Sequence, residues 1–228
     1  MKFESLPGYI RYEEGRAIQH ALVDARARDE IEDTILFLEH APVVTRGRGL
    51  QQNGETRERH MPLMGPLPAD VEFADSERGG DLTYHGPGQL VVYPIIKLNG
   101  SSPLAAHHDV TGFLRQFEKI FIDDLIALGL PARADTGATG VWVGDKKLVS
   151  IGIAVRKWVT YHGAAINIVN DLKPFHSISP CGFSPGVMTR LSSLTTVPQE
   201  WRTWIEGRLT ARFSAELSTR FQTEASGF

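Results

Sequence analysis

Residues 89–96, which read QLVVYPII, place the strongest limit on how this chain can fold, because almost every position is apolar. A strand with one face in water alternates apolar and polar residues, whereas a strand covered on both faces reads as a continuous apolar run. The segment therefore predicts a central strand of a covered sheet. Pro94 cannot donate a hydrogen bond to a neighbouring strand, so we place it late in this strand or at a bulge.

Helical and strand-like patterns alternate before and after this segment. Residues 18–25 carry apolar side chains at helical spacing, and residues 34–39 are strand-like. The strongest helical pattern covers residues 110–125, and Gly129 with Pro131 marks its end. No low-complexity linker or internal repeat divides the 228 residues, so the pattern predicts an α+β fold, with residues 1–228 forming a single domain.

The second half of the chain continues this alternation. Residues 141–155 predict a β-hairpin with its turn at residues 144–147, and residues 159–169 predict a further strand. Residues 201–217 have large apolar side chains at four-residue steps, which is typical of a helix packed on a sheet. Residues 51–75 are rich in Pro, Gly, Arg and Glu, and we interpret them as a long surface connection of the kind that often carries function.

Composition excludes several classes of protein. The formal net charge of −3 argues against a nucleic-acid partner, which normally requires a basic excess. The sequence contains no run of about 18 apolar residues, so it predicts no membrane-spanning helix. Residues 1–8 lack the apolar core of a signal peptide. The single cysteine cannot form an internal disulfide, which favours a reducing cytoplasm. Neither HExxH nor CxxC spacing occurs, which argues against a catalytic metal.

The single cysteine, Cys181, lies in a segment of turn-forming residues, between Pro180 and Gly182. A cysteine that only fills space is usually found in an apolar run, because a free thiol behaves as a small hydrophobic group. A rigid and exposed position suits a nucleophile instead. An inert thiol stays the alternative unless other residues are found to pair with Cys181.

Three more segments carry a chemical signal. Residues 78–89 contain four glycines and a histidine before the apolar strand, so a ligand can approach the backbone there, although the pattern is neither GxGxxG nor a P-loop. Lys147 enters an apolar strand, where its charge is unfavourable unless it is paired. The alternative interpretation of Lys147 is a solvated lysine of the hairpin turn, and we interpret Lys146 in that way. Small residues interrupt the strand at residues 163–165 and leave room for a ligand or a neighbouring helix.

Taken in order, the segments RGGDLTYHGPGQ, KLVSIG, HGAAIN and PCGF closely resemble the lipoyl(octanoyl) transferase family, over roughly residues 38–194. The resemblance implies one α+β domain with a mixed sheet and flanking helices, related to lipoate and biotin protein ligases. It implies the first step of endogenous protein lipoylation, in which octanoyl-acyl carrier protein is the donor. The implied acceptors are lysines of the lipoyl domains of 2-oxoacid dehydrogenase E2 subunits and of the glycine cleavage H protein. It further implies a monomer with no cofactor.

The same resemblance implies roles for individual residues. Cys181 matches the nucleophile and Lys147 its partner. The implied substrate-binding residues come from three segments: Arg78, Gly79, Gly80, Asp81, Leu82, Thr83, Tyr84 and His85; Ser150, Ile151 and Gly152; Gly163, Ala164 and Ala165.

The chemistry of these residues is consistent with a two-step transfer through a Cys181 thioester. A free thiol has a pKa of about 8.5, and a nearby Lys147 ammonium would favour the thiolate. Lys147 is also our candidate base for the acceptor amine. His85 and His162 could activate the thiol instead, and we favour His85 as a loop anchor or substrate contact.

The donor and its acyl chain lead to two further expectations. Small residues along the strands suggest an apolar tunnel, where burying the acyl methylenes at about 0.8 kcal/mol each would contribute roughly 5 kcal/mol. Because carrier proteins are acidic, we expect a locally basic mouth. The candidates are Arg46, Arg48, Arg78, Arg156 and Lys157.

Two other functions stay open. An ATP-dependent lipoate or biotin ligase is suggested by Arg46-Gly47-Arg48-Gly49, which resembles the glycine-arginine loop of biotin ligases, whereas the transferases usually show a Thr-Leu-Gly-Arg type of stretch at residues 45–48. The role of that loop is therefore open, but such ligases need no nucleophilic thiol. A non-enzymatic module that binds carrier or lipoyl domains is the third hypothesis, and the presence of both Cys181 and Lys147 argues against it.

Overall fold

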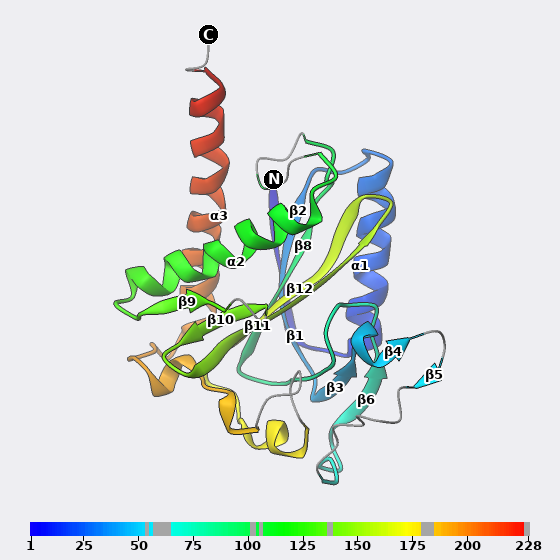
Figure 1. Ribbon diagram of the computed structural model, residues 1–228, viewed down its shortest axis with the longest axis vertical. Coiled ribbons are helices and arrows are strands. Elements are labelled where there is room, and N and C mark those ends of the chain that lie inside the picture. Colours follow the sequence, from blue (N-terminus) through cyan, green and yellow to red (C-terminus); the bar gives the residue numbers. More distant parts are fainter. Residues whose placement is uncertain are drawn as a thin grey trace.

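The computed structural model describes residues 1–52, 55–56, 65–100, 104, 107–135, 139–178 and 185–225. Within these residues, a seven-stranded sheet forms the centre of the molecule (Figure 1). In spatial order its strands are β1 (Lys2–Ile10), β2 (Thr34–His40), β8 (Gln89–Ile95), β12 (Val159–Asn167), β11 (Lys146–Arg156), β10 (Gly140–Val143) and β9 (Ala132–Ala134). β1 runs parallel to β2 and all other neighbours are antiparallel. The predicted α+β fold with a mixed sheet is confirmed.

Strand β8 lies inside this sheet, between β2 and β12, and all of its residues are buried. Leu90 and Val92 pack into the core on one face of the sheet, and Val91 and Tyr93 pack on the other. The strand is therefore covered on both faces, as its continuous apolar run predicts. Pro94 pairs with Ile35 near the end of the strand, where its missing N–H is tolerated.

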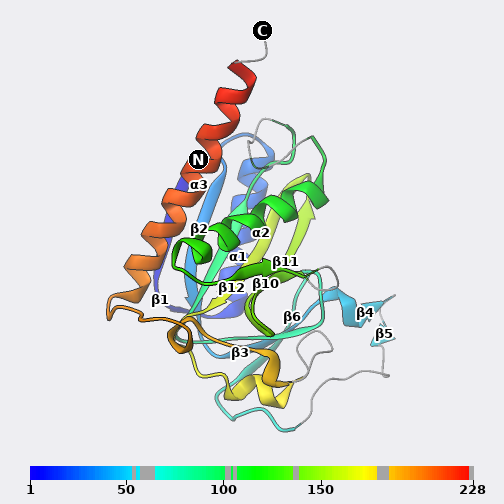
Figure 2. The same ribbon diagram turned by 60° about the vertical axis from the view of Figure 1, so that its left-hand side comes forward.

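Helices α2 (Val110–Ala127) and α3 (Trp201–Ala225) cover the same face of the sheet (Figure 2). The core there includes three rings of α2 and one of α3: Phe113, Phe117, Phe121 and Phe213. The Asp109 carboxylate caps α2 by accepting a hydrogen bond of 2.7 Å from the Gly112 N–H. Gly129, with φ of +79°, follows the end of the helix, as predicted.

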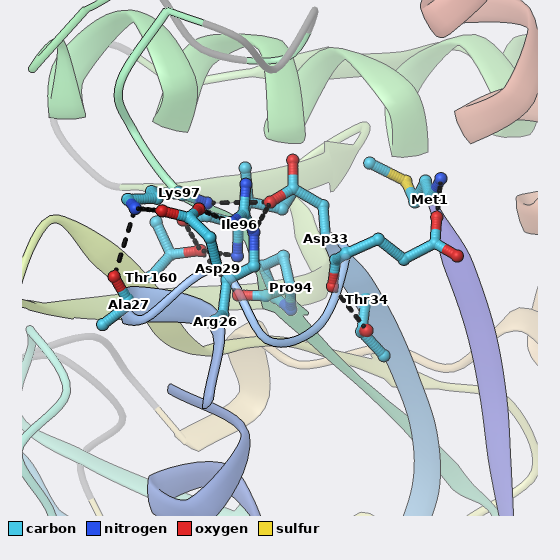
Figure 3. A network of polar contacts seen from close by, with 11 residues as sticks. Met1, Arg26, Ala27, Asp29, Asp33, Thr34, Pro94, Ile96, Lys97 and Thr160 are labelled. Atoms are coloured by element: carbon cyan, nitrogen blue, oxygen red, sulfur yellow. Dashed lines mark hydrogen bonds and ion pairs between the residues drawn. The ribbon is translucent and has the colours of Figure 1, made fainter. Parts of the chain in front are cut away.

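Helix α1 (Tyr12–Ala27) packs on the opposite face, where Ile18 and Leu22 contact the apolar side chains of β2 and β8. Polar contacts hold its C-terminal end against the sheet (Figure 3). Arg26 Nε donates to Asp33 Oδ1 at 2.7 Å, and Lys97 Nζ donates to the Ala27 carbonyl oxygen at 3.1 Å. With its last turn fixed in this way, α1 holds its first turn beside residues 76–78, where the pocket described below is found.

A second, smaller sheet contains β6 (Glu72–Asp75), β3 (Val43–Arg46) and β7 (Leu82–His85), in that order. The interpretation of residues 51–75 as a surface connection is wrong for β6. Its side chains are mostly exposed, so it shows none of the apolar alternation that identifies a strand. The remaining short elements are β4 (Gln51–Gln52), β5 (Glu55–Thr56) and the 3-10 turns η1 (Arg48–Leu50), η3 (Lys173–Ser177), η5 (Pro185–Val187) and η6 (Leu191–Ser193).

Among the described residues, no helix has the length and apolar character needed to cross a bilayer.

Candidate active site

A pocket of about 590 Å³, open to solvent, lies between the main sheet and the loop of residues 78–81. Its lining draws on the three segments expected to bind substrate: Arg78, Gly79, Gly80, Leu82, Thr83, His85, Ser150, Ile151, Gly152, Gly163, Ala164 and Ala165, together with Lys147. Asp81 and Tyr84 belong to the same segments but do not line this pocket. The Tyr84 ring packs edge-on against Phe175 in the core beside the smaller sheet. Cys181 lies outside the described residues.

A β-bulge in β11 directs Lys147 toward the pocket. Val141 of β10 pairs with Val149, but the next residue, Trp142, pairs with Lys147, so Leu148 is an extra residue on β11. In a regular strand Lys147 would face the same side as Val149. Because the bulge shifts the alternation by one, Leu148 joins Val149 in the core, and Lys147 lines the pocket with Ser150 and Gly152.

Lys147 and Lys146 have different environments although they are adjacent. Lys147 is 4% exposed, and its Nζ lies 5.8 Å from the centre of the Trp142 ring. Lys146 is exposed and donates to the Gly186 carbonyl oxygen at 2.9 Å. Lys146 is therefore the solvated lysine of the hairpin, and Lys147 is not. The Thr189 N–H donates to the Lys147 carbonyl oxygen at 3.0 Å, which fixes the backbone at this point.

Arg78 holds the loop of residues 78–81 in shape. Its guanidinium donates to the carbonyl oxygens of Thr45 and Asp81, both at 2.8 Å, and to that of Gly79 at 3.0 Å. Backbone hydrogen bonds from Gly47 to Asp81 and from Gly49 to Gly80 attach residues 47–49 to the same loop. The role left open for residues 46–49 is thus, in this structure, support of the loop that covers the pocket.

The expected basic mouth is largely neutralised. Arg78 lines the pocket, but it is only 8% exposed and its guanidinium donates to backbone carbonyl oxygens. Arg46 pairs with Asp75 at 2.7 Å. Arg156 and Lys157 both pair with Asp24, at 2.8 and 3.1 Å.

A group of packed rings lies at the pocket, and we call it the ring cluster: Tyr12, His40, Tyr93 and His162. The sequence singles out only His162 among these four residues. Tyr12, Tyr93 and His162 line the pocket. His162 has φ of +55°, an uncommon value for a residue other than glycine. Consecutive strand residues normally face opposite sides, yet both Tyr161 and His162 contact the α1 side of the sheet. The unusual backbone at His162 accounts for this.

The histidines around the pocket are held neutral. Burial lowers the pKa of His40 to about 4 and that of His85 well below its usual value. His85 donates from Nδ1 to Gln89 Oε1 at 2.8 Å, which fits the expected anchor or substrate contact. Burial also lowers the pKa of His162, and its Nε2 donates to Glu77 at 3.3 Å. That hydrogen bond lowers the pKa of Glu77 to about 2.

Acid should therefore destabilise the protein through His40. Below pH 6.5 the unfolded chain binds a proton at this histidine, whereas the folded chain does so only near pH 4. The free energy of unfolding therefore decreases as pH falls from 6.5 to about 4, and His40 accounts for roughly 3 kcal/mol of this decrease. Urea unfolding between pH 7 and 4.5 should show a steeper loss for the native chain than for His40→Gln. Equal slopes would contradict this expectation.

The protein family follows from comparison with known proteins. A family model described as lipoyl protein ligase A/B catalytic domain matches residues 11–209, and the chain belongs to this family. An octanoyltransferase of Geobacter metallireducens is 40% identical over 191 residues, which cover 84% of this chain and 82% of that protein. An octanoyltransferase of Caldicellulosiruptor bescii is 42% identical over 190 residues, covering 82% and 79% of the two chains.

The fold is also that of a solved ligase structure. Lipoate-protein ligase A bound with ATP aligns with a TM-score of 0.66 and 17% identity, over 96% of this chain and 86% of that chain. The predicted relation to lipoate ligases in fold is confirmed. At this level of identity the alignment shows the fold alone.

Proposed function

We propose that this protein is an octanoyltransferase of protein lipoylation, which moves an octanoyl group from octanoyl-acyl carrier protein to a lysine of a lipoyl domain. The identity of about 40% to octanoyltransferases, over about four-fifths of the chain, carries this conclusion. A pocket with small residues on two strands and a buried lysine beside it supports the same chemistry.

The proposed reaction has two steps. In the first, the Cys181 thiolate attacks the thioester carbonyl carbon, a new carbon–sulfur bond forms, and the carrier thiolate leaves. In the second, the neutral acceptor amine attacks the same carbon, the amide bond forms, and the Cys181 thiolate leaves. As an ammonium, Lys147 stabilises the Cys181 thiolate and then gives its proton to the departing carrier thiolate, which leaves as a thiol. The neutral Lys147 amine takes the proton of the acceptor amine in the second step, which restores the ammonium beside the thiolate. Met188, seven residues after Cys181, forms a β-bridge with Lys147, so residues flanking the cysteine segment lie close to this lysine.

The acyl chain is proposed to lie along β11 and β12. Pairing joins Ser150 to Ala165 and Gly152 to Gly163, so these small residues follow one another along the pocket away from Lys147. The next pair brings in His162, which stacks with Tyr12. We infer that the acyl carbonyl lies near Lys147 and that Tyr12 and His162 lie at the far end of the chain.

Replacing Tyr12 with leucine should consequently shift the preference toward longer acyl chains. Each methylene newly buried is worth about 0.8 kcal/mol, or roughly fourfold in competition. The measurement is competition between octanoyl-, decanoyl- and dodecanoyl-carrier proteins for acyl-enzyme formation. Tyr161→Leu is the control, because Tyr161 is equally buried on β12 but does not line the pocket. An unchanged preference in Tyr12→Leu, or the same shift in both variants, would exclude this placement.

Several finer assignments belong to the same proposal. The acceptors are the lipoyl domains of 2-oxoacid dehydrogenase E2 subunits and of the glycine cleavage H protein, and the chain acts as a cytoplasmic monomer of one domain. A lipoyl domain incubated with octanoyl-carrier protein and this chain, without ATP, should gain an octanoyl group. An acceptor that stays unmodified would refute the transferase assignment.

An ATP-dependent ligase is the second candidate, because the fold is shared with a ligase bound to ATP. This activity would require octanoate and ATP in place of the carrier thioester. The same acceptor assay with octanoate and ATP separates the two functions.

A further inference from the structure

The end of the Lys147 side chain lies against the backbone of Gly140. A Cβ atom built on Gly140 would be 2.5 Å from both Lys147 Cε and the Val149 carbonyl oxygen, and 3.2 Å from Lys147 Nζ. The end of Lys147 and the Val149 carbonyl thus share the space that any other side chain at position 140 would need. Gly140 also has φ of +137°, a conformation that favours glycine. The position of the lysine therefore depends on the position of Gly140.

Glu118 of α2 holds Gly140 in place. The Gly140 N–H donates to Glu118 Oε1 at 2.9 Å, and Arg115 Nη1 donates to the other carboxylate oxygen at 2.8 Å. Glu118 is 1% exposed and is buried on α2 together with Phe117 and Phe121. Burial of a carboxylate is unfavourable unless its oxygens accept hydrogen bonds, and one of these bonds comes from the strand that Lys147 packs against.

We propose that Glu118 is a positioning residue for Lys147, which acts through Gly140 to keep the ammonium group at the pocket. This inference rests on the proposed function, in which Lys147 assists Cys181. Glu118 does not line the pocket, so its effect reaches the reaction through the lysine. Displacement of a reacting group by about 1 Å can lower a rate by about a hundredfold, so a modest shift of Gly140 is sufficient to matter.

The test compares Glu118→Leu and Glu118→Gln with a matched control at another buried acid of α2. Glu118→Leu removes the acceptor for the Gly140 N–H and should slow acyl-enzyme formation from octanoyl-carrier protein by about 10- to 100-fold, with little change in KM. Glu118→Gln keeps a side-chain oxygen acceptor and should restore most of the rate. Asp124→Leu is the control, because Asp124 is also buried on α2 but pairs with Arg208 of α3.

The dependence of the acylation rate on pH separates positioning from general loss of stability. A displaced ammonium stabilises the thiolate less, so Glu118→Leu should move the rise in rate to higher pH, whereas Asp124→Leu should not. Equal slowing in Glu118→Leu and Asp124→Leu, or an unchanged rate and pH profile in Glu118→Leu, would overturn the inference. Should Glu118→Leu fail to fold, Gly140→Ala is expected to displace Lys147 and slow acylation in the same way, and an unaffected rate there would overturn it.

A structural measurement tests the inference without relying on enzyme activity. In a crystal structure of Glu118→Leu, Lys147 Nζ should have moved away from Gly140, and an unmoved Nζ would overturn the inference even if the native chain formed the acyl-enzyme. If the native chain forms no acyl-enzyme but Lys147 is displaced in Glu118→Leu, the proposed function is refuted. The inference that Glu118 positions Lys147 is then still supported.

Discussion

Cys181→Ala is expected to lower transfer of octanoyl from carrier protein to a lipoyl domain by roughly four orders of magnitude or more. The reason is that loss of a covalent nucleophile removes both steps of the proposed cycle and not only one contribution to a barrier. The measurement is the rate of acceptor modification, followed by mass spectrometry, with native and variant chains at equal concentration.

Cys181→Ser provides a stricter comparison, because it keeps the size and position of the side chain while changing the nucleophile. A serine hydroxyl is far less ionised than a thiol at neutral pH, so this variant should also be inactive on the same time scale. Undiminished transfer by either variant would mean that the only cysteine of the chain is structural.

Lys147→Met should give the second largest effect, a loss of about 10²- to 10⁴-fold in the rate of acyl-enzyme formation and of transfer to the acceptor. Methionine fills much of the volume of the lysine stem but carries no charge and cannot accept a proton. The transfer rate should fall less in Lys147→Met than in Cys181→Ala, because the nucleophile is still present in Lys147→Met. Single-turnover measurements of the two half-reactions would show whether both are slowed.

The adjacent lysine is the natural control for this variant. Lys146 is exposed and donates to the Gly186 backbone carbonyl oxygen, so Lys146→Met should leave both half-reactions near the native rate. Similar losses in the two lysine variants would indicate that local structure, and not the Lys147 ammonium, is being tested. A Lys147→Met variant with native rates would remove this residue from the mechanism.

Segments with a local periodic signal could be predicted from the sequence. The continuous apolar run at β8, the helical spacing in α2 and the turn between β10 and β11 each depend on residues close together in the chain. Most residues of the three segments implied by the family resemblance line the pocket as well, and glycines or small residues give a local signal in residues 78–89 and 163–165. Their binding roles stay predictions.

Residues brought to the pocket by long-range packing could not be found in this way. Tyr12 lies in the first turn of α1, in a part of the chain where no chemistry had been identified, and it meets His162 only because α1 packs across the sheet. The bulge that directs Lys147 depends on pairing with β10, and nothing in residues 147–152 indicates an extra residue. Glu118 gave no signal because a single acid in an amphipathic helix usually faces solvent.

The central claim is that the chain carries the acyl group on Cys181, and intact-protein mass spectrometry tests it most directly. The native chain is incubated with octanoyl-carrier protein and no ATP, beside Cys181→Ala. The account predicts one octanoyl adduct on the native chain, removed by hydroxylamine and missing from the variant. No adduct on the native chain, together with acylation of a lipoyl domain only when octanoate and ATP are supplied, would contradict it.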